Sequence, residues 1–250
     1  MLTKDLAICI RAIDYSETSQ IVTFFTKATG KIDVIAKGSK RPKSAFDGPI
    51  EVFSYGRIVF SDSKRDKLAT LTEFESAYGG TGFTSLSHDL AVLNCCLFAA
   101  ELINKMTHDY DPHPELFDSF LGFLQNATDK ESKNQMLKLL ILFQFSLLRE
   151  IGLQPVLDCC VNCKTQYTKR ANQNEIYFSS SANGIICRDC ESSFPDKIRL
   201  SKTASNCLSN LKLIAEAKEK ILKEIEKVLI THFTELLGHR PKMAKHFLKS

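Results

Sequence analysis

Residues 160–163 read Cys-Val-Asn-Cys and residues 187–190 read Cys-Arg-Asp-Cys, with 23 residues between the two pairs. A Cys-x-x-Cys turn places two sulfurs on one side of a metal ion, and a second such turn completes the tetrahedron of ligands that Zn²⁺ prefers. Between the pairs, Ile176–Phe178 and Ile185–Ile186 flank Asn183-Gly184, which predicts a short hairpin. The pattern therefore predicts a zinc ribbon. Its expected metal ligands are Cys160, Cys163, Cys187 and Cys190.

Disulfide bonds and a redox dithiol are weaker interpretations of these cysteines. Disulfides suit a secreted chain, whereas the N-terminal sequence has no apolar signal core, so a reducing cytosol is expected. A redox site needs one reactive pair, and a second pair would be surplus. Because a closed site of four thiolates leaves no open position for a substrate, the zinc is expected to be structural.

Five further cysteines lie outside the two pairs. Cys159 is adjacent to Cys160 and could replace it as a ligand, but Cys160 has the two-residue spacing to Cys163. The other four fall in apolar strand or helix patterns and are predicted to be small core residues. They are Cys9, Cys95, Cys96 and Cys207.

The first 80 residues predict a small all-β domain. Five short segments are rich in Ile, Val, Phe and Thr, and turn residues separate them. Five strands in this length fit a closed barrel of the OB type, and an SH3-like barrel fits the pattern nearly as well. The predicted strands are Leu6–Ile13, Gln20–Thr26, Lys31–Ala36, Val52–Phe60 and Lys67–Glu75.

Beyond Gly82 the apolar period changes from two to 3.6, which predicts helices. The third helix is apolar nearly all round and is expected at the centre of a helical domain. The predicted helices are His88–Thr107 with Ser87 as N-cap, His113–Asn126, Ser132–Ile151, Ser201–Glu216 and Ala217–Leu237. The predicted fold is therefore α+β and multidomain. An OB-type barrel spans residues 1–80, and a helical domain spans 81–250 with the zinc ribbon inserted at about 157–194.

Composition and charge are those of an ordinary soluble protein. Of the 250 residues, 44% are hydrophobic and 25% are charged, with a formal net charge of +4. Residues 81–150 carry 5 Lys/Arg against 9 Asp/Glu, whereas residues 201–250 carry 10 against 5. A chain with basic ends and an acidic middle can hold a polyanion on one surface and another partner elsewhere. The longest apolar run is too short to span a bilayer, so no membrane partner is expected.

A Gly/Ser/Pro loop after the third predicted strand carries four cations and no acid within seven residues. Such cations can follow phosphates, and the small residues let backbone N–H groups approach them. The expected DNA-binding residues of this loop are Lys37, Lys40, Arg41 and Lys43. A second cluster lies at residues 64–67, in a later connection that would flank the groove of an OB barrel. Phe46, Phe53 and Tyr55 are candidates for base stacking, although burial accounts for most strand aromatics.

Catalytic motifs are missing from the sequence. The six histidines are scattered outside any known metal-binding pattern, and neither a phosphate-binding P-loop nor a GxSxG nucleophile motif is present. The chain is therefore expected to be a binding protein rather than an enzyme.

Three groups of stretches together resemble the RecO family of bacterial DNA repair and recombination mediator proteins. They follow one another in matching order over essentially the whole chain. The first group is Arg11–Thr18, Thr26–Lys31, Ala36–Gly38 and Arg41–Ser44, the second is Gly152–Leu157 ahead of the first cysteine pair, and the third is Phe178-Ser179 with Gly184 ahead of the second pair.

The resemblance implies binding of single- and double-stranded DNA and annealing of complementary strands. It also implies help in loading the RecA recombinase onto DNA coated by single-strand-binding protein, with RecR as partner, in the bacterial cytoplasm at the nucleoid. The implied fold is an OB domain followed by a helical domain with a zinc-binding insertion. The positions carried over are the basic loop and the four thiolates.

Two other functions stay open at this stage. A zinc-ribbon adaptor in transcription or translation would bind RNA or protein. A zinc enzyme would need an open coordination position, which four thiolates do not leave.

Overall fold

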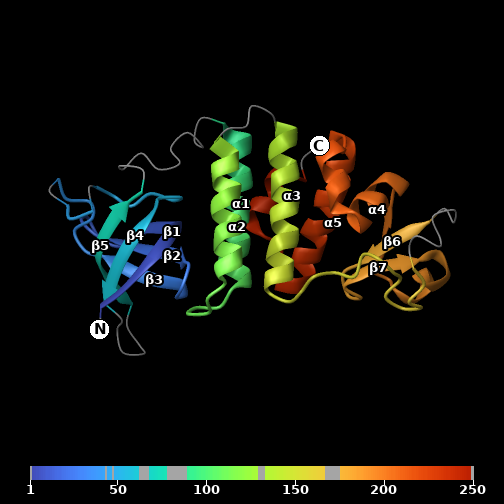
Figure 1. Cartoon of the computed structure of the whole chain (residues 1–250), viewed down its shortest axis with the longest axis horizontal. Coiled ribbons are helices and arrows are strands. Elements are labelled where there is room, and N and C mark those ends of the chain that lie inside the picture. Colours follow the sequence, from blue (N-terminus) through green and yellow to red (C-terminus); the bar gives the residue numbers. More distant parts are fainter. Residues whose placement is uncertain are drawn as a thin grey trace. The chain divides into compact units, whose positions relative to one another are not determined.

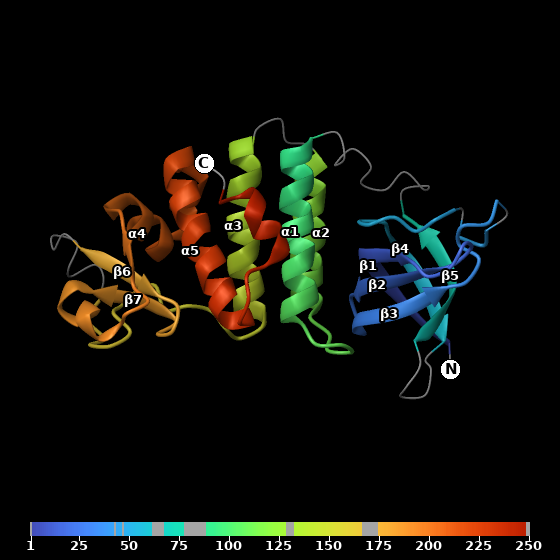
Figure 2. The ribbon, with the colours of Figure 1, turned by 180° about the vertical axis from the view of Figure 1, so that it is seen from behind.

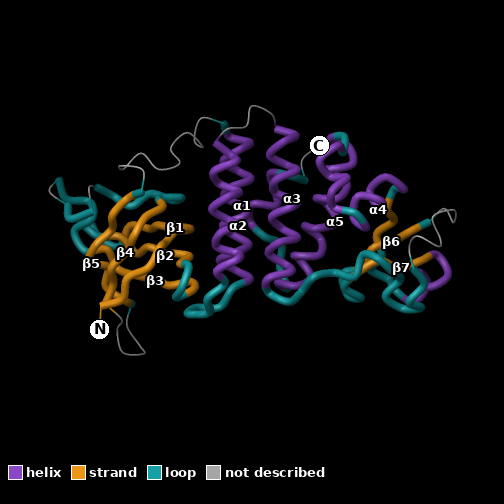
Figure 3. Tube along the Cα trace, in the orientation of Figure 1, coloured by secondary structure: helices purple, strands orange, loops and turns teal. Residues whose placement is uncertain are grey.

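The computed structural model describes residues 2–42, 44–46, 48–61, 68–77, 89–128, 133–166 and 175–248. The chain forms two compact units, Met1–Asp129 and Lys130–Ser250. The first holds five strands and two helices, and the second holds the remaining helices and a small sheet (Figures 1 and 3). The sequence predicts a domain boundary between residues 80 and 81. Residues 78–88 lie outside the described part, so this boundary stays a prediction.

The five N-terminal strands close into a barrel in the order β1-β2-β3-β5-β4. The β3–β5 pair is parallel and the other pairs are antiparallel, which is the arrangement of an OB barrel and confirms that prediction over the SH3-like one. The strands are β1 (Leu2–Asp14), β2 (Gln20–Thr26), β3 (Gly30–Ala36), β4 (Tyr55–Ser61) and β5 (Ala69–Ser76).

The long strand β1 closes the barrel by pairing with two neighbours. Its first half pairs with β4 and its second half pairs with β2, and the register shifts between Cys9 and Arg11. Such a bulge bends a strand and increases its twist, which closure requires. The alternating inward residues fill the barrel with aliphatic and aromatic side chains, among them Phe24, Ile32, Val34 and Phe60.

Two helices complete the first unit: α1 (Leu90–Met106) and α2 (Pro114–Thr128). Helix α1 begins after Asp89, whose carboxylate accepts hydrogen bonds from the amides of Ala91 and Val92. The predicted N-cap, Ser87, lies outside the described residues. Asp89 therefore supplies the cap that the sequence interpretation had assigned two residues earlier.

The β2–β3 hairpin contacts the turn between α1 and α2. Lys31 Nζ donates to the carbonyls of Asn104 (2.8 Å) and Thr107 (2.9 Å), and the amide of Tyr110 donates to the Lys31 carbonyl (3.0 Å). Because the last carbonyls of a helix lack partners within it, the ammonium group caps the end of α1. On the same side, the rings of Phe25 and Phe117 lie 6.0 Å apart.

The second unit contains α3 (Lys133–Glu150), α4 (Lys202–Ser209) and α5 (Glu219–Leu237). Figure 2 shows α3 and α5 side by side. The predicted helix over residues 201–216 ends at Ser209 and is followed by a 3₁₀ turn, Leu211–Glu216, because the Asn210 side chain accepts from the Lys212 amide. Among the described residues, no helix combines the length and apolar character that a membrane span requires.

A buried polar pair joins α3 to α5. Gln144 Nε2 donates to Glu226 Oε1 at 2.9 Å, and both residues are almost fully enclosed. Burial raises the pKa of Glu226 to about 7, against the opposing effect of the Gln144 hydrogen bond. Six residues further along α5, burial lowers the pKa of His232 to about 4, and its ring meets that of Phe178 edge to face at 5.3 Å. In the folded chain both groups therefore favour their neutral forms.

These two groups make opposite contributions to the pH dependence of stability. Glu226 stabilises the fold below its unfolded pKa of 4.5, and this contribution is lost as pH rises toward 7. His232 stabilises the fold above its unfolded pKa of 6.5, and this contribution is lost as pH falls toward 4. We expect Glu226→Gln to leave only the histidine slope, with about 3 kcal/mol of stability gained between pH 4.5 and 6.5. We expect His232→Leu to show the reverse slope.

Urea unfolding of the three proteins across this pH range measures the slopes. Glu235→Gln, which neutralises an exposed carboxylate on the same helix, is the control and should follow the unsubstituted chain. Parallel pH profiles for Glu226→Gln and His232→Leu would show that these residues are not held neutral.

Candidate nucleic-acid interface and metal centre

The basic loop leaves β3 in a tight turn. Gly38 has a φ of 74°, a left-handed conformation that favours glycine, and the Arg41 amide donates to the Gly38 carbonyl at 3.1 Å. Lys37 and Arg41 are exposed, whereas Lys40 is half-buried. In the described part of the chain, Lys37 and Arg41 form no ion pair, so their charges are available to an anion.

A buried polar contact fixes the base of this loop. The Ser39 hydroxyl donates to Gln20 Oε1 at 2.9 Å, and the same oxygen accepts from the Ile50 amide at 2.9 Å. Gln20 Nε2 donates in turn to the Ile50 carbonyl at 3.2 Å. Because each polar group in this buried triad has a partner, the backbone at Ser39 is held in place while Lys37 and Arg41 stay exposed.

Further contacts join the loop to the β1–β2 turn. The Lys40 amide donates to the Thr18 carbonyl at 3.1 Å, and the Gly38 amide donates to Ser19 Oγ at 3.3 Å. Lys40 Nζ also lies 2.6 Å from Asp14 Oδ2, so its charge is partly neutralised. The structure therefore gives Lys40 an anchoring role beside its predicted contact with DNA.

The structure brings together three of the four predicted DNA-binding cations, Lys37, Lys40 and Arg41. Lys43 lies outside the described residues, as does the second basic cluster at residues 64–67. The contact of all four cations with DNA stays a prediction.

The three candidate stacking aromatics are not exposed, in keeping with the expectation that burial accounts for most strand aromatics. Phe46 and Phe53 are 8% and 4% exposed, so they belong to the core and their interpretation as stacking residues is wrong. Tyr55 is half-buried, with its ring 6.4 Å from that of Phe117. The barrel instead exposes Tyr15, which is 62% accessible on the β1–β2 turn. The sequence could have indicated this exposure, because Tyr15 stands in an Asp-Tyr-Ser turn, where burial is not expected.

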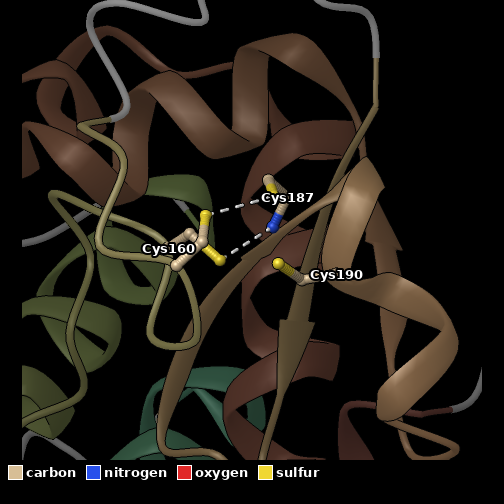
Figure 4. Close-up of side chains that lie close together, drawn as sticks. Cys160, Cys187 and Cys190 are labelled. Atoms are coloured by element: carbon tan, nitrogen blue, oxygen red, sulfur yellow. Dashed lines mark hydrogen bonds between the residues drawn. The ribbon is translucent and has the colours of Figure 1, made fainter.

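The four cysteines of the two pairs converge in the second unit. Their sulfurs all lie within 4.8 Å of one another, and Figure 4 shows Cys160, Cys187 and Cys190 directed toward one point. The Cys163 and Cys187 sulfurs are 3.7 Å apart, and a tetrahedron with Zn–S bonds of about 2.3 Å has edges of about 3.8 Å. Cys159 is not part of this group. The cluster could hold a metal ion, and its all-sulfur donors are compatible with zinc.

A small antiparallel sheet carries this cluster, in the order β7-β6-β8. Its strands are β6 (Ile176–Ser179), β7 (Gly184–Cys187) and β8 (Ile198–Leu200). The first two form the predicted hairpin, and β8 is an addition that the sequence pattern did not indicate. Cys187 ends β7, and Cys190 follows in the 3₁₀ turn Arg188–Ser193.

The first cysteine turn is attached to the hairpin through its backbone. The Val161 amide donates to the Ile185 carbonyl at 2.9 Å, and the Ile185 amide donates to the Val156 carbonyl at 2.9 Å. A Cβ on Gly184 would lie 2.4 Å from the Val156 carbonyl oxygen, so only glycine permits this approach. This close contact holds the segment before the first cysteine pair against the hairpin that leads to the second pair.

The thiols differ in their affinity for protons. Hydrogen bonding with the side chain and amide of Thr165 lowers the pKa of the exposed Cys163 to about 6. Burial, reinforced by hydrogen bonds with the neighbouring thiols, raises the pKa of Cys187 to about 12. The two pKa shifts have opposite signs because hydrogen bonds with Thr165 dominate at the exposed Cys163, whereas burial dominates at Cys187. The Cys187 amide also donates to Cys160 Sγ at 3.4 Å, which joins the end of β7 to the first cysteine turn.

The four free cysteines outside this region are buried, as predicted. Burial raises the pKa of Cys9 and Cys96 to about 12, so both thiols stay protonated and unreactive. In the described part of the chain, the cysteine cluster is the one group of potential ligands arranged for a metal ion.

Together these features define a class of protein: an OB barrel with a fixed cationic loop, joined to a helical unit that carries a four-cysteine ribbon. Comparison with known families agrees with this description. The family model for the N terminus of Recombination protein O matches residues 1–79, and the model for its C terminus matches residues 87–245. The chain belongs to the RecO family.

Individual relatives match over nearly the whole chain. The DNA repair protein RecO of Bacillus subtilis (strain 168) is 30% identical over 255 residues, which cover 99% of this chain and 94% of the relative. The Bacillus pumilus (strain SAFR-032) protein of the same name is 30% identical over 246 residues, or 95% and 90%. That of Anaeromyxobacter dehalogenans (strain 2CP-C) is 28% identical over 255 residues, or 98% and 95%. The predicted family and fold class are both confirmed.

Proposed function

We propose that this chain is a DNA-binding recombination mediator that acts in DNA repair and catalyses no covalent reaction. Its membership of the RecO family and the names of its relatives support a role in repair. The single observation that carries DNA binding is the basic loop, in which Lys37 and Arg41 are exposed above a buried anchor at Ser39 and Gln20. Fixed cations on a barrel surface suit a phosphate backbone.

Annealing of complementary strands needs electrostatics rather than a reacting side chain. Two strands repel each other through their phosphates, and a cationic surface that holds both lowers this repulsion while the bases stay free to pair. The cysteine cluster offers four thiolates, which would close a zinc site to substrate. Zinc would therefore stabilise the ribbon.

The wider role follows from the family resemblance. We propose that the chain binds single- and double-stranded DNA in the bacterial cytoplasm, at the nucleoid. With RecR it would help to load RecA onto DNA coated by single-strand-binding protein. The structure assigns no residues to these protein contacts.

Charge reversal in the loop tests the proposal. We expect Lys37→Glu/Arg41→Glu to weaken single-strand binding at least about tenfold at low salt and to reduce the slope of log K against log salt by about 1.4, since each lost phosphate contact removes about 0.7. Fluorescence anisotropy with a labelled oligonucleotide at several salt concentrations measures both. We substitute Lys37 and Arg41 because Lys40 also anchors the loop through Asp14.

The matched control is Lys4→Glu/Arg57→Glu, which changes net charge equally at exposed positions on β1 and β4. Equal weakening in both variants would indicate a general charge effect, and unchanged affinity in the loop variant would remove the loop from the interface. An RNA oligonucleotide of the same sequence distinguishes the proposal from an RNA-binding adaptor, which would prefer RNA.

A further inference from the structure

Tyr15 is an exposed aromatic residue at the tip of the β1–β2 turn. The residue is 62% exposed, and among the described residues the only other tyrosine or phenylalanine exposed to a similar degree is Tyr110, at 51%. The turn is closed by hydrogen bonds from the amides of Tyr15 (2.9 Å) and Ser16 (3.2 Å) to the Ser19 carbonyl. An aromatic ring on a short, closed turn exposes a flat apolar face to solvent at a fixed position.

This turn and the basic loop form one connected surface. Thr18 and Ser19 each accept a hydrogen bond from the loop, and Asp14, which directly precedes Tyr15, holds the ammonium group of Lys40. Hydrogen bonds and one ion pair therefore join the turn that carries Tyr15 to the loop that carries the cations. A ligand that contacts both must combine a flat apolar group with negative charge.

The adjoining sheet surface has the same mixed character. Ala12 packs against the barrel core, so its neighbours Arg11 and Ile13 face outward. Arg11 is exposed, and Ile13 is 40% accessible beside its cross-strand partner Ile21. Arginine and apolar side chains thus continue the surface from Tyr15 along β1.

We propose that Tyr15 is a stacking platform for an unpaired nucleobase, while the basic loop holds the phosphates on either side of it. The inference rests on the proposed DNA binding and adds a basis for preferring single strands. A base in a duplex is already stacked between its neighbours and cannot offer its face to Tyr15, whereas the phosphates are accessible in both forms. Removing the ring should therefore weaken single-strand binding selectively.

The chain contains no tryptophan, which allows a direct optical test. In Tyr15→Trp the new indole is the sole tryptophan, and stacking on a base quenches its fluorescence. We expect strong quenching by oligothymidylate of about 20 nucleotides and little quenching by a duplex of equal length. Fluorescence anisotropy of the labelled DNA, measured in parallel, checks that both forms are bound. Tyr110→Trp, at an exposed tyrosine on the α1–α2 turn, is the matched control and should show no quenching.

Affinity measurements complete the test. We expect Tyr15→Leu to bind the single strand about tenfold more weakly and the duplex within about twofold of the unsubstituted chain, whereas Tyr15→Phe, which keeps the ring, binds both normally. Thermal unfolding confirms that each variant is folded.

The outcomes separate the inference from the function on which it rests. If the unsubstituted chain binds no DNA, both fail. If it binds DNA, but Tyr15→Trp is not quenched and Tyr15→Leu binds normally, the stacking platform is wrong and the DNA-binding function stands. Equal losses for single strand and duplex in Tyr15→Leu would mean that Tyr15 shapes the loop, which also overturns the inference.

Discussion

Replacing Cys160 with serine is expected to abolish metal binding and to destabilise the ribbon by about 4 kcal/mol or more, an effect in the range that loss of a structural metal produces. The reason lies in the size of the ribbon core. Its buried members are Cys160, Tyr177, Ile186, Cys187 and Cys190, of which three belong to the cysteine cluster. So small an apolar core cannot offset the entropy of ordering its loops without a further constraint. A bound metal would supply that constraint, because its binding energy is also folding energy.

The adjacent cysteine provides a closely matched control. Cys159→Ser makes the same chemical change one residue earlier, at a position outside the cluster, and should keep its metal and its stability within about 1 kcal/mol. Elemental analysis of the purified proteins and thermal unfolding with and without a chelator measure both properties. Retention of stoichiometric metal by Cys160→Ser, or its loss from Cys159→Ser, would show that the ligand set has been assigned incorrectly.

Features with a local origin were predictable from the sequence. Alternating apolar residues between turn residues fixed five barrel strands to within a few residues, and the change to a 3.6-residue period indicated α1, α2, α3 and α5. The two Cys-x-x-Cys turns indicated the cysteine cluster, because the preference of zinc for four thiolates makes such a spacing specific. The exposed positions of Lys37 and Arg41 followed from their place in a Gly/Ser loop.

Features that depend on contacts between distant residues were not predictable. Lys31 looks like an ordinary solvent-exposed strand lysine, and only the structure shows its ammonium group at the end of α1, more than 70 residues away. The anchoring of Lys40 by Asp14 likewise depends on how two loops meet. Phe46 and Tyr15 illustrate the same limit from opposite sides. Both are aromatic residues near turns, and the closure of the barrel buries one and exposes the other.

Gly30→Ala is expected to destabilise the first unit by about 2–4 kcal/mol and to loosen the contact between the β2–β3 hairpin and the α1–α2 turn. Gly30 has a φ of 84°, and a Cβ there would lie 2.4 Å from the Asp111 carbonyl oxygen. Left-handed strain contributes about 1–2 kcal/mol, and relief of the clash contributes a similar amount. Relief requires a shift of the Asp111 backbone, which is one residue from the hydrogen bond between the Tyr110 amide and the Lys31 carbonyl.

Gly238→Ala separates these two effects. Gly238 ends α5 with a φ of 70°, and nothing lies within 4 Å of the position its Cβ would occupy, so this substitution should cost only the strain of about 1 kcal/mol. Urea unfolding measures the stabilities, and hydrogen exchange of the Tyr110 amide reports on the contact itself, because that amide should lose protection in Gly30→Ala and keep it in Gly238→Ala. Equal destabilisation with a protected Tyr110 amide would mean that the Cβ at position 30 is accommodated without breaking the hydrogen bond between the Tyr110 amide and the Lys31 carbonyl. Loss of this protection in Gly30→Ala would instead show that the hairpin has moved, and the Lys31 ammonium group would then lose its position against the carbonyls of Asn104 and Thr107 at the end of α1.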